Sequence, residues 1–133
     1  MRLSRLPGEH EIHARDINVR SFEFAAAIMR LVHTLKDQAP AYLLNCLAEE
    51  GASVGEHVAE AHQSSSKRTY LSRMTSGRHA ARRVQYWLRL LDALGVTPKE
   101  EIEALTAEAA ALHTALNILC AKTRQSLDAE TSA

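Results

Sequence analysis

Apolar residues recur at helical spacing through nearly the whole chain, and this periodicity restricts the fold more than any other feature. From about residue 16, steps of three and four join Phe24, Ile28, Leu31 and Leu35. Three further segments carry such seams: Leu44, Leu47, Gly51, Val54, Val58 and Ala61; Tyr70, Gly77, Ala81, Val84, Leu88 and Leu91; and Ile102, Leu105, Ala109, Leu112, Leu116 and Leu119. With 5 Gly and 3 Pro in 133 residues, turn formers are too few for a many-stranded β fold.

Helix-ending and helix-starting signals separate these segments. Pro40 ends the first helix, and a polar Gln63–Ser66 loop offers Ser65 or Ser66 as the N-cap of the third. Gly95 is a natural terminator, and Thr97, Pro98 and Glu100 predict a capping box for the last helix. We therefore expect an all-α, antiparallel up-down-up-down four-helix bundle over residues 15–126. Residues 1–14 are expected to form an N-terminal arm and residues 127–133 a flexible C-terminal tail.

Two features bear on how these helices pack. Gly51 and Gly55 interrupt the second helix among small residues, which indicates either a very close neighbouring helix or a local kink. Phe22, Ala26 and Met29 form a second apolar stripe on the first helix, so this helix needs more than one packing partner. We expect the bundle to assemble with copies of itself into a ring-like homo-oligomer.

Composition and the chain's start predict a cytoplasmic protein with no membrane segment. Hydrophobic residues make up 46% and charged residues 24%, which is typical of a folded globular protein. No apolar run reaches the roughly 18–20 residues that span a bilayer, and the N-terminus lacks the apolar region of a signal peptide. Cys46 and Cys120 lie among apolar helical residues and are expected to be reduced thiols.

Net charge is zero, but the charges are segregated along the chain. Residues 61–91 contain seven Lys and Arg and no Asp or Glu, whereas residues 37–60 contain five Asp and Glu and no Lys or Arg. On a helical wheel the third helix carries a stripe of basic residues, formed by Lys67, Arg78, Arg82 and Arg89. Arg68 lies beside this stripe. This stripe either binds phosphates or pairs with acids on a neighbouring helix or subunit. Pairing is favoured because acidic helices flank the stripe and the aromatic residues are not spaced as a base-stacking platform.

Arg73 falls on the apolar side of the same helix, and a charge there needs a partner. Glu60, near the facing end of the second helix, is the candidate. We interpret this as a structural ion pair and not as a catalytic one.

No set of residues has the spacing of a known catalytic or metal centre. Ser64–Lys67 matches a serine–lysine motif but lacks its companion motifs. Glu56, His57, Glu60 and His62 have no matching ligand sets on other helices, which a di-metal bundle requires. We therefore expect no enzymatic activity, no cofactor, no metal and no small-molecule substrate.

Several segments, at matching spacing, resemble the four-helix-bundle proteins of the 23S rRNA intervening-sequence family. The resemblance covers about residues 16–124 and rests on Phe22–Ala25, Gly51–Ala61, Ser66, Tyr70, Arg73–Met74 and Tyr86–Leu91. It implies a small cytosolic bacterial protein, related to some encoded within large-subunit rRNA genes, that forms a homopentamer. A distant basic branch partners a reverse transcriptase and nucleic acid, and most members have no established activity.

The chain departs from this family pattern at two charged positions. Glu49 stands where the family usually has a basic residue, and Arg83 where it usually has an acid. If the two positions touch, the ion pair survives with its ends exchanged.

The leading functional prediction is a non-enzymatic assembly or adaptor protein that contacts RNA or an RNA-handling partner through its basic third helix. The alternative is a protein–protein interaction module that binds no nucleic acid, its basic helix being neutralised by acidic ones. The two differ in whether the basic stripe is open to solvent.

Overall fold

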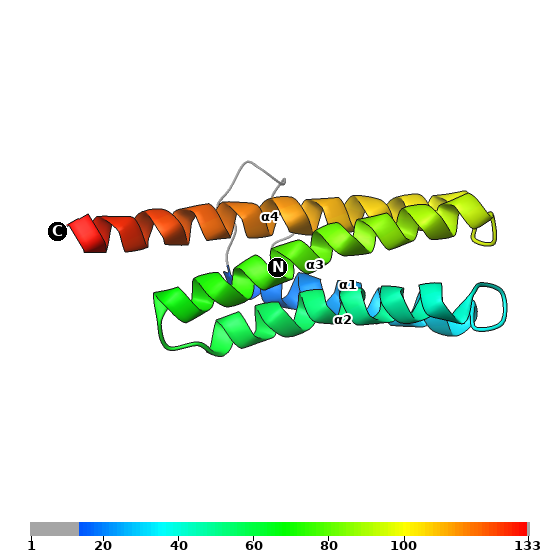
Figure 1. Ribbon diagram of the computed structural model, residues 1–133, viewed down its shortest axis with the longest axis horizontal. Coiled ribbons are helices and arrows are strands. Elements are labelled where there is room, and N and C mark those ends of the chain that lie inside the picture. Colours follow the sequence, from blue (N-terminus) through cyan, green and yellow to red (C-terminus); the bar gives the residue numbers. More distant parts are fainter. Residues whose placement is uncertain (1–13, 133) are drawn as a thin grey trace.

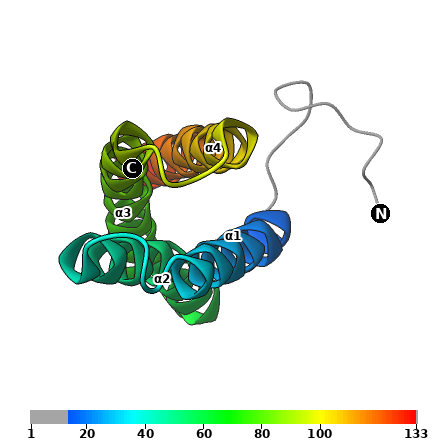
Figure 2. The same ribbon diagram turned by 90° about the vertical axis from the view of Figure 1, so that its right-hand side faces the viewer.

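The computed structural model describes residues 14–132 and contains four helices and no strand in that range. They are α1 (Ala14–Thr34), α2 (Ala41–Gln63), α3 (Lys67–Leu94) and α4 (Lys99–Ser132). The α1–α2 and α3–α4 loops lie at one end of the molecule and the α2–α3 loop at the other (Figure 1). Each helix packs against its sequence neighbours, and α1 also contacts α4, so the four surround a common core (Figure 2). The prediction of an all-α bundle of four helices is confirmed.

The core is built from the predicted apolar seams. Ile28, Leu47, Leu88 and Leu112 contribute one side chain from each helix, and all four are fully buried. The first and last helices are also joined by polar contacts, because Arg20 donates to Glu108 through Nε at 3.1 Å and Nη2 at 2.8 Å. This two-pronged bond raises the pKa of Arg20, and the partial burial of the guanidinium opposes the shift only in part.

The glycines of α2 mark a close approach of two helices, and the kink alternative is not observed. A Cβ placed on Gly51 would lie 2.8 Å from Cγ2 of Ile28, and one on Gly55 would lie 3.2 Å from the carbonyl oxygen of Ser21. Helix α2 is continuous through both positions. Glycine is therefore required here by the proximity of α1, which offsets its poor helix propensity.

Of the four predicted helix boundaries, those at Ser66 and Gly95 have the expected chemistry. The prediction that Pro40 ends the first helix is wrong, because α1 ends at Thr34 and Pro40 instead stands directly before the first residue of α2. Ser66 caps α3, its Oγ accepting from the backbone N–H of Thr69 at 3.1 Å, and Gly95 ends α3 with a left-handed φ of 70°. The capping box at the start of α4 is wrong. The helix begins at Lys99, and Oγ1 of Thr97 is buried without a hydrogen-bond partner among the described residues.

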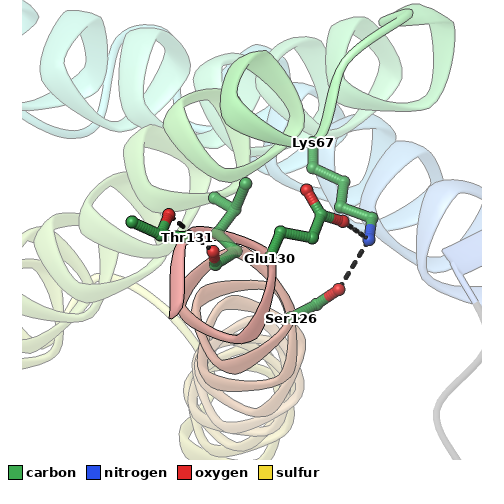
Figure 3. A network of polar contacts seen from close by, with 5 residues as sticks. Lys67, Ser126, Glu130 and Thr131 are labelled. Atoms are coloured by element: carbon green, nitrogen blue, oxygen red, sulfur yellow. Dashed lines mark hydrogen bonds and ion pairs between the residues drawn. The ribbon is translucent and has the colours of Figure 1, made fainter. Parts of the chain in front are cut away.

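The predicted flexible tail is corrected by the structure, because α4 remains helical to Ser132. Neither Gly nor Pro follows Pro98, so nothing in the sequence stops the helix. Its last turns pass the beginning of α3, where Lys67 donates to Oγ of Ser126 at 2.6 Å and pairs with Glu130 (Figure 3). The proposed N-terminal arm lies outside the described residues, apart from Ala14, which begins α1.

Helix α4 is long and apolar enough to cross a membrane by length and composition alone, which the sequence reading did not anticipate. An 18-residue window reaches a mean hydropathy of 1.3, and 33% of that window is buried. Much of this hydropathy comes from alanines such as Ala104, Ala107, Ala110 and Ala111, all exposed. The opposite side of the helix packs into the bundle core through its leucines, as in a core helix.

Candidate nucleic-acid interface

The basic stripe of α3 lies along the side of that helix that faces α4. Arg78, Arg82 and Arg89 follow one another at steps of four and seven, so they share one face of α3. Arg78 fixes the direction of this face, since its Nη1 donates to Oδ1 of Asn117 on α4 at 3.0 Å. Arg82 and Arg89 are exposed.

Lys67 differs from the rest of the stripe because its charge is neutralised. It pairs with Glu130 on α4 at the far end of the bundle, as Figure 3 shows. Both side chains are at least half exposed, so the ion pair adds little to the stability of the fold. It does mean that the charge of Lys67 is already matched by that of Glu130.

The other members of the stripe keep their charge available. Within residues 14–132, no carboxylate lies within 4.0 Å of the guanidinium of Arg68, Arg78, Arg82 or Arg89. The only side-chain partner of Arg78 in that range is a neutral amide. The structure therefore divides the predicted stripe into one neutralised lysine and four arginines that form no ion pair with an acid of the described part of the chain.

The two predicted ion pairs lie on the other side of α3, against α2. Arg73 Nη1 is 3.1 Å from Oε1 of Glu60, and both side chains are 45% exposed, so the pair is a surface contact and not a buried one. Arg83 pairs with Glu50, Nε to Oε2 at 2.9 Å, and not with Glu49. One residue turns a helix by about 100°, which leaves Glu49 exposed and brings Glu50 towards α3.

A basic residue that sequence reasoning missed extends the stripe onto α4. Arg124 and Arg78 line opposite sides of a shallow depression between α3 and α4. The rest of its lining is mostly polar: Asn117, Gln125 and Asp128, with Cys120 and Ala121. Arg124 follows Asn117 by seven residues and so shares its helix face, but which face of α4 meets α3 is not evident from either helix alone.

Positive charges gather around His113 of α4 where α3 and α4 meet. Burial lowers its pKa, and the nearby charges of Arg82, Arg78 and His79 lower it further.

We refer to Arg78, Arg82, Arg89 and Arg124 together as the basic face.

An aromatic cluster lies beside the basic face, formed by Tyr42 of α2 with Tyr86 and Trp87 of α3. The Trp87 ring meets Tyr42 at 6.0 Å and Tyr86 at 5.3 Å between centroids, both edge to face. Tyr42 is 72% and Tyr86 51% exposed, whereas Trp87 is half-buried. Sequence spacing argued against an aromatic platform, but the tertiary fold brings Tyr42 against Trp87, which follows it by 45 positions.

Glu56, His57, Glu60 and His62 of α2 were the residues considered as possible metal ligands. Among the described residues, no three His, Cys, Asp or Glu side chains are grouped so that they could hold an ion. His57 instead faces α3, where its Cβ is 3.6 Å from a Cβ placed on Gly77. Its Nδ1 is buried and has no hydrogen-bond partner in that part of the chain.

The arrangement defines a four-helix protein with a cationic seam and no recognisable catalytic centre among the described residues. Residues 15–118 match the model of the 23S rRNA-intervening sequence protein family. The chain belongs to this family, as its sequence motifs indicated.

One similar solved structure is a crystal structure of a protein of unknown function from the S23 ribosomal protein family of Bacteroides thetaiotaomicron. It superimposes with a TM-score of 0.76 at 22% sequence identity, covering 80% of this chain and 96% of that one. At this identity the likeness establishes the fold. A search of curated proteins returns no match.

Proposed function

We propose that this protein is a non-enzymatic assembly or adaptor protein that contacts RNA through the basic face. The observation that carries the proposal is that, within residues 14–132, no carboxylate lies within 4.0 Å of the guanidinium of Arg78, Arg82, Arg89 or Arg124. Such arginines attract phosphates, which supply most of the affinity in nucleic-acid binding.

The dimensions of the basic face suit a polyanion. Arg78 and Arg89 are eleven residues apart on one helix, which corresponds to about 16 Å along its axis. Arg124 widens the face across the seam to α4, and Asn117 and Gln125 add amide donors beside it. Several phosphates of one strand can therefore be contacted together.

The protein is proposed to act as a ring-like homo-oligomer, a pentamer by family resemblance, in the cytoplasm. Support comes from α1, where Phe22 is 71% exposed and Val19 and Met29 lie exposed on the same stripe. Exposed apolar stripes of this kind are typical of protein interfaces. A ring would repeat the basic face once per subunit and so raise its avidity for a long RNA.

The test is the affinity of the purified protein for a structured rRNA fragment across a salt series. We expect log K to fall steeply with log salt, and Arg78→Ala or Arg82→Ala to reduce the magnitude of that slope by about one each. Arg73→Ala is the matched control, because it removes an arginine already paired with Glu60 on the opposite flank of α3. Its slope should equal that of the wild type.

Absence of binding at low salt would overturn the proposal. The alternative of a protein–protein interaction module without nucleic-acid binding would then replace it. Equal losses of RNA affinity in the Arg73→Ala and Arg82→Ala variants would also contradict the proposal. They would show that RNA binding depends on the total positive charge and not on the basic face.

A further inference from the structure

We propose that the RNA bound by this protein is single-stranded, and that its unpaired bases stack on the aromatic cluster of Tyr42, Tyr86 and Trp87. This inference rests on the proposed function and specifies its ligand. It takes the occupant of the aromatic cluster to be the same strand whose phosphates lie on the basic face.

Tyr86 lies next to the arginines of the basic face on α3. Arg82 precedes it by four residues and Arg89 follows it by three, so both are its neighbours on the helix surface. Tyr86 therefore lies between the basic face on the α4 side and the two other aromatic rings on the α2 side. A strand held by Arg82 and Arg89 has its bases within reach of the Tyr86 ring.

The aromatic cluster is both exposed and held in place. Trp87 is half-buried and packs edge to face against both tyrosines, which orders their rings before any ligand arrives. Preorganised aromatic rings lose little conformational entropy on binding, and each stacked base contributes about 1–3 kcal/mol. Leu90 and Leu94 extend the exposed apolar surface towards the end of α3.

Charge selects among the occupants of this surface. Within the described residues no carboxylate lies within 4.0 Å of the guanidinium of Arg82 or Arg89, so negative charge on a ligand seated beside Tyr86 is favoured. A second copy of this surface would bring arginines against arginines. A duplex would bring phosphates, but its base faces are stacked within the helix and cannot reach an aromatic side chain.

The experiment uses Trp87, which is the single tryptophan of the chain and so reports on this cluster alone. The full-length protein is titrated with an oligouridylate and with an RNA duplex carrying the same number of phosphates. We expect the single strand to quench Trp87 fluorescence and to bind at least tenfold more tightly than the duplex at moderate salt.

Variants separate stacking from charge. Tyr86→Ala should weaken oligouridylate binding by about tenfold or more and leave the salt slope unchanged, because stacking is not an ionic contact. Tyr86→Phe keeps the aromatic ring and should retain the affinity. Tyr42→Ala removes a second, more exposed ring of the cluster and should also weaken oligouridylate binding. Arg82→Gln should instead reduce the magnitude of the salt slope by about one.

The outcomes distinguish this inference from the proposed function. If Tyr86→Ala and Tyr42→Ala bind like the wild type while Arg82→Gln binds more weakly, the stacking inference is overturned and the RNA contact stands. If neither RNA binds at low salt, both fail. If Tyr86→Ala lowers the molecular mass in solution without affecting RNA affinity, the cluster is a subunit contact and the inference is wrong.

Discussion

Side-chain volume at a single position of α2 sets how closely the first two helices pack. A methyl group on Gly51 would overlap Ile28, which is fully buried and cannot move aside freely. We predict that Gly51→Ala lowers the free energy of unfolding by about 1 kcal/mol, overpacking outweighing the gain in helix propensity. Chemical denaturation measures the difference.

Gly77 of α3 is the matched control. A Cβ there would meet its nearest neighbour, Val58, at 3.5 Å, which is ordinary van der Waals contact. Gly77→Ala should therefore stabilise the protein by up to about 1 kcal/mol through helix propensity. Equal effects of the two substitutions would contradict the argument from close approach.

His113 makes the stability of the protein depend on pH. Burial and the charges of Arg82 and Arg78 lower its pKa, so the folded protein binds the proton less readily than the unfolded chain. This contribution to stability is complete above the ordinary pKa of about 6.5 and is lost as the pH falls below it. His113→Gln should flatten the acid side of a stability-against-pH curve.

Arg82→Gln offers an independent check of the same cause. Removing this charge should raise the pKa of His113 towards its ordinary value, as measured by NMR titration. An unchanged titration would show that the charge of Arg82 does not reach His113.

Among the helices, α3 and α4 differ in how their first turns are satisfied. Ser66→Ala removes the acceptor for the N–H of Thr69 and should cost about 1 kcal/mol in the free energy of unfolding. Thr97→Val, before α4, removes a buried hydroxyl without a hydrogen-bond partner among the described residues, so it should be neutral or stabilising. A loss in Thr97→Val as large as in Ser66→Ala would show that Thr97 does cap α4.

Helix number and core composition could be predicted from sequence because both follow from the spacing of apolar residues within one segment. Gly95 was identified correctly as the end of α3, and Ser66 was one of the two serines predicted to cap it, since each acts on backbone groups a few residues away. The end of α4 was placed too early, although neither Gly nor Pro follows Pro98 to stop the helix. The contacts of Lys67 with Ser126 and Glu130 on its last turns were not predicted either, because they join residues 59 and 63 positions apart. Local patterns do not contain such contacts.

The same limit applies to the candidate site. The shared face of Arg78, Arg82 and Arg89 is a property of one helix and was predicted from its period. Arg124 and Tyr42 join the site from other helices, and their places depend on rotation and offset between helices. Glu49 was predicted as the partner of Arg83, whereas the structure pairs Arg83 with Glu50, so the prediction was wrong by one residue in that rotation.

For the whole molecule, the exposed stripe of α1 leads to a prediction about assembly. Phe22→Glu places a charge at the most exposed large apolar side chain of α1, and we expect it to convert the proposed homo-oligomer into monomers. Molecular mass by light scattering measures this, and circular dichroism checks that the helices remain. Glu56→Gln, an exposed change on α2, is the control and should leave the mass unaltered.

The junction between α1 and α4 has a consequence for the order of events during synthesis. Arg20 and Glu108 are 88 residues apart, whereas the other helix pairs that pack together are consecutive in the chain. A nascent chain can therefore form helical hairpins as soon as each pair leaves the ribosome, but the core stays open along α1 until α4 emerges. Ile17 and Phe24 belong to the core that α4 completes, so the interval before α4 arrives is when a growing chain is most exposed to aggregation.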